Sequence, residues 1–233
     1  RVIAAMNRKG GCGKTTLIMG LASAAAARGE SVTIFDTDES RSISKWRDRA
    51  QAQGHWNDLV EVIPTLSVAV VTDRIGEIYA QSDQEHLILV DTFGGGSEAQ
   101  DHIAMMAHLL VAPCMLSAMN YEENRETGLW YQRLKRRVED PAAVPPFKVI
   151  LNRVPLSRSA AELEVYEKVI RDLPVLGDVI MDRAMYKRLD GQGLLDEIRR
   201  KTRNPGVASH LGVALAEMDE VLTELDRSIR EAA

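Results

Sequence analysis

A glycine-rich segment near the amino terminus has the residue types that bind phosphate. Residues 9–16 read KGGCGKTT and lie between a short apolar run at 2–5 and an alanine-rich segment. Glycines let backbone N–H groups turn toward phosphate oxygens, and the N-terminus of a following helix adds partial positive charge. Because GK[ST] in a strand–loop–helix setting is typical of a P-loop, we expect Lys14 to reach the β- and γ-phosphates of a nucleotide and the Thr15 hydroxyl to ligate Mg²⁺. The predicted nucleotide-binding residues of this loop are Lys9, Gly10, Gly11, Cys12, Gly13, Lys14, Thr15 and Thr16.

Aspartates follow two other apolar runs. The run at 32–35 ends in Asp36 and Asp38, and the run at 87–90 ends in Asp91, which precedes three glycines at 94–96. Open α/β sheets bind ligands at the carboxyl ends of their strands, so these carboxylates are candidates for a metal site. We expect Asp91 to hold Mg²⁺ through water and the glycines to let the following loop move when a γ-phosphate is present. Asp is also common in turns after strands, which is the alternative for Asp36 and Asp38.

A lysine at the start of the phosphate loop is not a general requirement of P-loops. With Lys9 in place, the segment KGGCGKTT resembles the deviant Walker A loop of the family that includes the ParA and MinD ATPases and the nitrogenase iron protein. The resemblance implies ATP and Mg²⁺ as ligands, an ATP-dependent sandwich homodimer, and slow ATP hydrolysis that a partner protein stimulates. It implies that Lys9 crosses this dimer to touch the partner's phosphates and takes part in catalysis. A solvated lysine beside the loop is the alternative.

The family pattern also assigns a role to the two aspartates after the 32–35 run. Asp36-Thr37-Asp38 resembles the switch I D-x-D of ParA relatives, in which the second aspartate positions the attacking water. The resemblance therefore implies that Asp38 is catalytic together with Lys9 and Lys14, and that Asp36 lies nearer the Mg²⁺ shell. The sequence departs from the family after this point, because ParA relatives often continue with Pro-Gln, whereas this chain has Glu-Ser at 39–40.

The adenine contact is predicted from a later strand. Residues 148–151 (KVIL) form an expected strand that ends in Asn152. In the family an asparagine or similar residue at the end of this strand reads the adenine edge, and Asn152 fits that position. An asparagine that caps the turn after the strand is the alternative.

Short β-branched runs alternate with longer segments of helical period, which predicts a doubly wound, mostly parallel α/β sheet of the P-loop type. We expect one ATPase domain over residues 1–233. The expected strands are 2–5, 32–35, 59–63, 86–90, 109–112, 148–151 and 175–180, and the expected helices are 15–27, 42–53, 72–81, 98–108, 122–137 and 160–172. A last helix at about 207–230 carries one apolar stripe and is expected to pack on this domain, although a seam for a partner helix is the alternative.

Composition excludes several classes of protein. The chain has 233 residues, of which 45% are hydrophobic and 27% charged, so it can bury a full core. No apolar run approaches the roughly 18–20 residues of a membrane helix, and the first residues lack a signal-peptide pattern, so we expect a cytoplasmic protein without membrane insertion. Because the chain starts at Arg1, we expect an initiator methionine to be missing. Cys12 and Cys114 cannot form a disulfide framework or the cysteine pair of an iron–sulfur reductase.

Longer segments narrow the resemblance further. The runs FDTDESRSISKWRDRA, DTFGGGSE and APCMLSAMNYEE are most similar to the VirC-type ParA relatives. This resemblance implies a role in conjugative or T-DNA transfer, with double-stranded DNA as a ligand and the relaxosome or the secretion-channel coupling protein as partner. A plasmid or chromosome partition ATPase that is stimulated by a centromere-binding protein is the closest alternative. A nucleotide-binding scaffold without DNA binding or turnover is an alternative of another class, and an acidic last helix argues against a membrane-positioning ATPase.

The charge distribution leaves room for a DNA partner. The formal net charge is −5, but residues 125–203 carry a net +5 and the rest of the chain −10. No helix-turn-helix, zinc-finger or RNA-binding signature is present, so contact would be mainly with backbone phosphates. A solvated helix face is the alternative for any one cluster. The candidate DNA-binding residues are Arg133, Arg136 and Arg137, then Arg183, Lys187 and Arg188, and finally Arg199 and Arg200.

Overall fold

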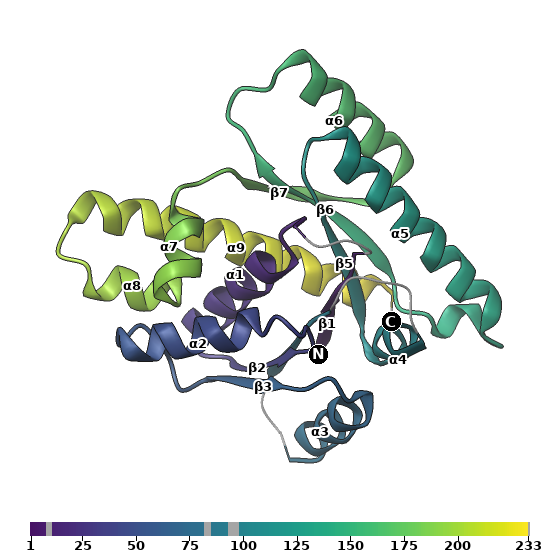
Figure 1. The fold of residues 1–233 in the computed structure, drawn as a ribbon, viewed down its shortest axis with the longest axis horizontal. Coiled ribbons are helices and arrows are strands. Elements are labelled where there is room, and N and C mark those ends of the chain that lie inside the picture. Colours follow the sequence, from purple (N-terminus) through teal and green to yellow (C-terminus); the bar gives the residue numbers. More distant parts are fainter. Residues whose placement is uncertain (8–10, 82–84, 93–97, 233) are drawn as a thin grey trace.

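Seven parallel strands form the centre of the computed structural model, which describes residues 1–7, 11–81, 85–92 and 98–232 (Figure 1). The strand order is β3-β2-β4-β1-β5-β6-β7, and β1 pairs with both β4 and β5. Such an order requires crossover connections, which helices supply on both faces of the sheet. The strands are β1 Val2–Ala5, β2 Ser31–Asp36, β3 Val60–Pro64, β4 His86–Asp91, β5 Leu109–Cys114, β6 Phe147–Val154 and β7 Val175–Met181.

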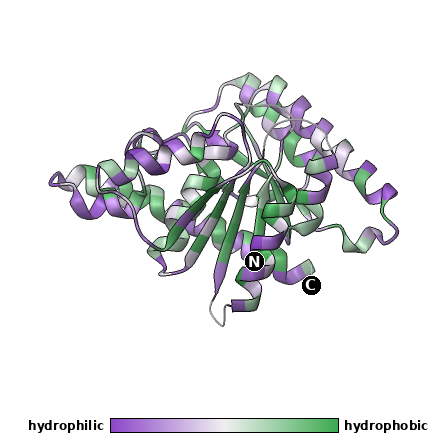
Figure 2. Ribbon diagram, turned by 60° about the horizontal axis from the view of Figure 1, so that its bottom comes forward, coloured by the Kyte–Doolittle hydropathy of each residue, from purple (hydrophilic) through white to green (hydrophobic). Residues whose placement is uncertain are grey.

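Helices cover the sheet in two layers. On one face of the sheet, the strands share a hydrophobic core with α1, α2, α7, α8 and α9. On the other face, they share a core with α3, α4, α5 and α6. Figure 2 shows the apolar strands enclosed between helices whose outer sides are polar. The helices are α1 Lys14–Ala27, α2 Ser42–Ala52, α3 Val68–Gln81, α4 Glu98–Met106, α5 Ala118–Arg137, α6 Ala160–Asp172, α7 Met185–Gln192, α8 Leu195–Lys201 and α9 Pro205–Ala232, with a 3₁₀ turn at Pro141–Ala143.

The sheet register brings the predicted functional residues to one edge. Asp36 of β2 pairs with Asp91 of β4, and Asp91 pairs with Ala5 of β1, from which the phosphate loop departs. Neighbouring strands of a sheet lie about 4.8 Å apart, so the ends of these three strands are close together. The carboxyl edge of the sheet is therefore where the site is assembled.

All seven predicted strands are confirmed, as is the parallel α/β class. The helices α3 and α5 begin four residues earlier than predicted, at Val68 and Ala118, and α4 ends two residues earlier, at Met106. The sequence did not predict α7 and α8. Each is too short, at eight and seven residues, to establish a helical period.

The last helix, α9, packs along one side of the molecule. One side of α9 lies against α1, α8 and β7, and its buried residues include Leu211, Met218, Leu222 and Leu225. In the described part of the chain, no helix has the length and apolar character required to span a membrane.

Candidate nucleotide site

The phosphate loop leads from β1 into α1 through two glycines in the left-handed region. Gly11 has φ +87° and Gly13 has φ +99°, and Gly13 is the residue before the first turn of α1. A side chain at Gly13 would also collide with the amide of Asn152. Glycine is thus required here by both conformation and space. Lys9 and Gly10, which the sequence predicts as part of this loop, lie outside the described residues.

Lys14 and Thr15 begin α1 and face the acidic strand ends. The Thr15 hydroxyl donates a hydrogen bond of 2.8 Å to Asp91 Oδ2. The Lys14 side chain is buried, and its positive charge acts on Asp91. The backbone N–H groups of this first turn have no partner within the helix, which makes the turn a natural anion site. The structure therefore brings the predicted Lys14, Thr15 and Asp91 together.

Asp36 is completely buried beside this group. Its Oδ2 accepts hydrogen bonds from the backbone N–H of Ser44 at 2.9 Å and from the Ser44 hydroxyl at 2.6 Å. One oxygen of Asp36 thus fixes the first turn of α2. This anchor to α2 was not predicted, because an Asp eight residues before a Ser matches no short capping motif.

Asp38 lies at the more open end of the same loop. Its Oδ1 accepts a hydrogen bond of 2.8 Å from the backbone N–H of Ser40, and its carbonyl accepts one of 3.0 Å from Arg41. Thr37, between the two aspartates, donates through its hydroxyl to the Asp91 carbonyl at 2.9 Å. The turn therefore ties the end of β2 to the end of β4 and leaves Asp38 partly exposed.

Burial raises the pKa of Asp91 to about 7. The hydrogen bond from Thr15 and the charge of Lys14 oppose this shift, whereas the negative charges of Asp36 and Asp38 reinforce it. A carboxylate whose ionised form is disfavoured by burial gains most from a nearby cation. Asp91 is thus poised to ionise when positive charge enters the site.

The donor set fits a magnesium ion. Asp36 Oδ1 and Asp91 Oδ1 are both buried and lack a hydrogen-bond partner. Among the described residues, no three His, Cys, Asp or Glu side chains are grouped as a metal cluster. Mg²⁺ typically takes one or two carboxylates and completes its shell with waters and nucleotide phosphates, so two carboxylates and a threonine hydroxyl suit it.

Asn152, at the end of β6, lies directly against the phosphate loop. Its side-chain amide donates a hydrogen bond of 3.1 Å to the Cys12 carbonyl and is buried. This contact holds the loop, and the adenine contact expected of Asn152 stays a prediction. Beside it opens a polar pocket, hereafter the Thr16 pocket, which is lined by Thr16, Asn152, Arg153, Asp182, Arg183, Tyr186, Lys187 and Asp190.

The three predicted basic clusters do not form one surface within the chain. The α5 cluster (Arg133, Arg136 and Arg137) lies near the end of that helix, just before β6 begins, and is therefore at the amino edge of the sheet. The other two are the α7 cluster (Arg183, Lys187 and Arg188) and the α8 cluster (Arg199 and Arg200). The α7 and α8 clusters lie at the opposite end of the molecule in Figure 1. Of the α7 cluster, Arg183 and Lys187 line the Thr16 pocket, and Arg183 is ion-paired with Glu217 at 2.8 Å.

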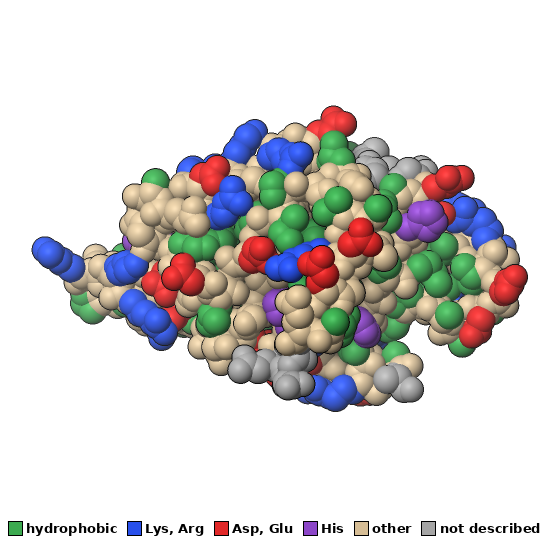
Figure 3. Space-filling model, turned by 90° about the horizontal axis from the view of Figure 1, so that it is seen from below, with side chains coloured by type: hydrophobic (Ala, Val, Ile, Leu, Met, Phe, Trp, Pro, Cys, Tyr) green, Lys and Arg blue, Asp and Glu red, His purple; other side chains and the backbone are tan. Residues whose placement is uncertain are grey.

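Two basic residues that the sequence analysis did not single out join the α7 and α8 clusters. Helix α2 packs on α7, and its Lys45 and Arg49 are exposed. Figure 3 shows Lys and Arg side chains gathered at the end of the molecule that α2 and α8 occupy. The spacing of Lys45 and Arg49, four residues apart in a helix, was the available signal for a shared face.

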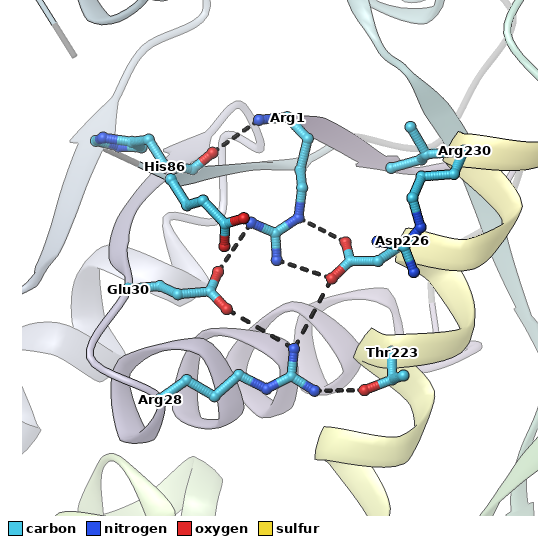
Figure 4. Close-up of a pocket in the computed structure, with 9 residues that line it drawn as sticks. Arg1, Arg28, Glu30, His86, Thr223, Asp226 and Arg230 are labelled. Atoms are coloured by element: carbon cyan, nitrogen blue, oxygen red, sulfur yellow. Dashed lines mark hydrogen bonds and ion pairs between the residues drawn. The ribbon is translucent and has the colours of Figure 1, made fainter. Parts of the chain in front are cut away.

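A second pocket lies at the amino edge of the sheet, away from the phosphate loop (Figure 4). Two of its cations, Arg1 and Arg28, are paired with carboxylates. Arg1 contacts Glu30 at 2.8 Å and Asp226 at 2.5 Å, and Arg28 contacts Asp219 at 2.5 Å. These pairs join β1 and the α1–β2 turn to α9, which is a structural role.

Comparison with solved structures identifies the class of fold. The chain matches pNOB8 ParA with a TM-score of 0.67 at 18% identity, covering 100% of this chain and 99% of that one. It matches MinD from Pyrococcus horikoshii OT3, solved as a complex with Mg-ADP, with a TM-score of 0.62 at 18% identity, covering 95% and 96% of the two chains. The structure therefore has the P-loop NTPase fold of ParA and MinD.

Sequence comparison gives the family. The family model described as VirC1 protein matches residues 1–231. Protein virC1 of Rhizobium radiobacter is 31% identical over 193 residues, covering 80% of this chain and 79% of that protein. Protein virC1 of Rhizobium rhizogenes is 27% identical over 224 residues, covering 96% and 89%. The chain belongs to the VirC1 family, which confirms the resemblance to VirC-type ParA relatives.

Proposed function

We propose that this protein is an ATPase that binds Mg-ATP, closes into a sandwich homodimer and then binds double-stranded DNA. The observation that carries the proposal is the convergence of Lys14, Thr15 and Asp91 at the phosphate loop, with unpartnered buried oxygens on Asp36 and Asp91. Structural neighbours with the same fold were solved with ATP, in the case of Cyanothece McdA, and with Mg-ADP, in the case of MinD.

The expected chemistry is positional and electrostatic. Lys14 would neutralise the β- and γ-phosphates, and Thr15, Asp91 and Asp36 would hold the magnesium shell. Bound Mg²⁺ would offset charge that develops on the phosphates during transfer. Asp38, partly exposed beside this group, would orient the attacking water. Lys9 would contribute from the partner subunit.

Exposed apolar side chains at the carboxyl edge support the dimer. Leu66, Met119 and Leu156 are 54%, 67% and 93% exposed, and they follow the ends of β3, β5 and β6. A second copy placed over the phosphate loops would cover this edge. Removing such side chains from water would stabilise the closed state by about 25 cal/mol per Å² of apolar surface.

Membership of the VirC1 family supports a cellular role in conjugative or T-DNA transfer. In this role the DNA-bound dimer would help bring the relaxosome to the secretion channel, and a partner protein would stimulate hydrolysis. The ParA-like fold favours plasmid or chromosome partition as the second candidate.

DNA would contact one of two basic surfaces. One is shared by α2, α7 and α8, and the other is the α5 cluster. In the dimer, the two subunits could present both surfaces to the same duplex. Among the described residues, Arg133 and Arg136 of α5 have no ion-pair partner, whereas Arg199 and Arg200 of α8 pair with Asp196. Arginine side chains without an ion-pair partner are available to neutralise DNA phosphates, which releases the counterions bound to the DNA. The affinity for DNA should therefore fall steeply as the salt concentration rises.

The test is fluorescence anisotropy of labelled duplex DNA at low and physiological salt, without nucleotide, with ADP and with a slowly hydrolysed ATP analogue. Tight binding only with the ATP analogue, lost in Lys14→Ala, is the expected result. The double variants Arg133→Ala/Arg136→Ala and Arg199→Ala/Arg200→Ala assign the surface, because each lost phosphate contact lowers the salt slope by about one. Binding of the ATP analogue without DNA binding in any state would instead favour a nucleotide-binding scaffold.

A further inference from the structure

A buried carboxylate on α9 stands directly behind the Thr16 pocket. Glu217 is 8% exposed and reaches across to the end of β7 and the start of α7. Its Oε1 accepts hydrogen bonds from the Met181 backbone N–H at 3.1 Å and from the Tyr186 hydroxyl at 2.5 Å. Its Oε2 accepts from Arg183 Nε at 2.9 Å and from a terminal Arg183 nitrogen at 2.8 Å.

All of these donors belong to one wall of the pocket or lead into it. Arg183 and Tyr186 line the Thr16 pocket, and Met181 is the last residue of β7, just before Asp182, which also lines it. Glu217 itself does not line the pocket. The pocket is also lined by Thr16 of α1 and by Asn152, whose amide already holds the phosphate loop.

We infer that Glu217 is a positioning residue that holds the Arg183–Tyr186 wall in place to receive the nucleoside part of the bound nucleotide. The inference rests on the proposed function, because it takes the phosphate loop as the site of the nucleotide's phosphates. Thr16 lies two residues after Lys14, so a ligand whose phosphates occupy the loop would place its sugar and base toward this pocket. The mixed charges of the lining suit ribose hydroxyls and the polar edge of a base.

The arrangement explains why a carboxylate is needed at position 217. Two N–H donors of Arg183 converge on Oε2 of Glu217, and charge-assisted hydrogen bonds of this kind are strong enough to hold the guanidinium in place. Burial next to Glu217 also raises the pKa of the Tyr186 hydroxyl, so the tyrosine stays protonated and donates. A glutamine would keep one acceptor for Met181 and Tyr186 but would turn an N–H toward Arg183.

The same helix and strand offer a matched control. Glu224 lies two helical turns further along α9 and accepts hydrogen bonds from the backbone N–H groups of Gly177 at 2.6 Å and Asp178 at 2.8 Å. Neither Gly177 nor Asp178 lines the Thr16 pocket. Glu224→Gln therefore perturbs the α9–β7 contact without touching the pocket wall.

The experiment measures the dissociation constant of Mg-ATP with a fluorescent ATP analogue, and that of inorganic tripolyphosphate by competition. Tripolyphosphate occupies only the phosphate loop. Glu217→Gln is expected to weaken ATP roughly 10-fold, equivalent to about 1.4 kcal/mol, and to leave tripolyphosphate within about 2-fold of wild type. Glu224→Gln should leave both constants unchanged.

A double-variant cycle tests whether Glu217 acts through Arg183. If it does, Arg183→Ala/Glu217→Gln should bind ATP no more weakly than Arg183→Ala alone, because the two changes remove one interaction. The inference would be overturned if Glu217→Gln weakened the binding of ATP and of tripolyphosphate equally, or weakened neither. Binding of both ligands by wild-type protein would still support the proposed function in that case. Wild-type protein that binds neither ligand would overturn the proposed function itself.

Discussion

At the scale of single residues, the site depends on a carboxylate that is costly to ionise. Asp91 is 2% exposed, and burial raises its pKa from 3.8 to about 7. Between these two pKa values, Asp91 is therefore protonated in the metal-free folded protein but ionised in the unfolded chain. The affinity for Mg²⁺ should rise with pH over the same range, because the ion binds the ionised form.

The pKa of Asp91 gives a prediction for stability in the absence of metal. A group with a raised folded-state pKa stabilises fully below its unfolded pKa, and that contribution is lost as pH rises through the folded pKa. Between pH 5 and pH 8 in EDTA, wild type should therefore lose about 2 to 3 kcal/mol relative to Asp91→Asn. Urea unfolding of both proteins at several pH values measures the difference, and a difference that does not change with pH would count against the buried acid.

Some of the contacts between site residues could be expected from the sequence and others could not. Lys14, Thr15 and Asp91 belong to local motifs, and the structure brings them together as those motifs predict. The Arg183–Glu217 pair joins residues 34 positions apart, and no spacing rule links them. From the sequence alone, Arg183 was a candidate DNA-binding residue because it belongs to a basic cluster.

At the scale of elements, α2 connects the site to the basic end of the molecule. Asp36 fixes the start of α2 through Ser44, and Trp46 in the next turn donates through its indole N–H to the Leu189 carbonyl of α7 at 2.7 Å. Trp46 is fully buried and packs edge-on against Trp56, with ring centroids 5.1 Å apart. Asp36 is therefore connected to α7 by two hydrogen bonds, both of which involve α2.

Removal of the indole N–H tests this connection. Trp46→Phe removes the indole donor to the Leu189 carbonyl, which keeps only the Gly193 N–H at 3.2 Å, and opens a small cavity. The free energy of unfolding should therefore fall by about 1 to 3 kcal/mol. Trp56→Phe is the control, since Trp56 is only partly buried and its bond to Val60 is local. Circular dichroism during urea unfolding gives both values, and equal losses would show that the α2–α7 hydrogen bond adds nothing.

The sequence predicted the strands better than the helices. The central strands, such as β1, β4 and β5, are short apolar runs buried on both faces, so their pattern is strong. The edge strands β3 and β7 are partly exposed, but they too are short runs rich in β-branched residues. Helices α7 and α8 bury few residues, such as Tyr186, Leu189 and Ile198, and their positions depend on contacts with α1, α2 and α9. Such helices are specified by tertiary packing, which a local pattern does not contain.

At the scale of the whole molecule, the carboxyl edge of the sheet would be both the nucleotide site and the dimer interface. Among the described residues, the most exposed apolar side chain at this edge is Leu156, at 93%. Leu156→Asp should place two charges against each other in the closed dimer and abolish the ATP-dependent increase in sedimentation coefficient. Binding of ATP to the monomer should be unaffected.

Ile170→Asp is the matched control for this prediction. Ile170 is 49% exposed near the end of α6, at the amino edge of the sheet. It should dimerise with ATP as wild type does. Loss of dimerisation in Ile170→Asp but not in Leu156→Asp would place the interface on another face.

The most direct test of the account is phosphate release from ATP by wild type, Lys14→Ala and Asp38→Ala, with Mg²⁺ or EDTA and with or without duplex DNA. We expect slow, Mg²⁺-dependent release by wild type and none by Lys14→Ala. Asp38→Ala should still bind ATP but release no phosphate, because it keeps the phosphate loop and loses the residue that orients water. Equal release by wild type and Lys14→Ala, or full release by Asp38→Ala, would contradict the account.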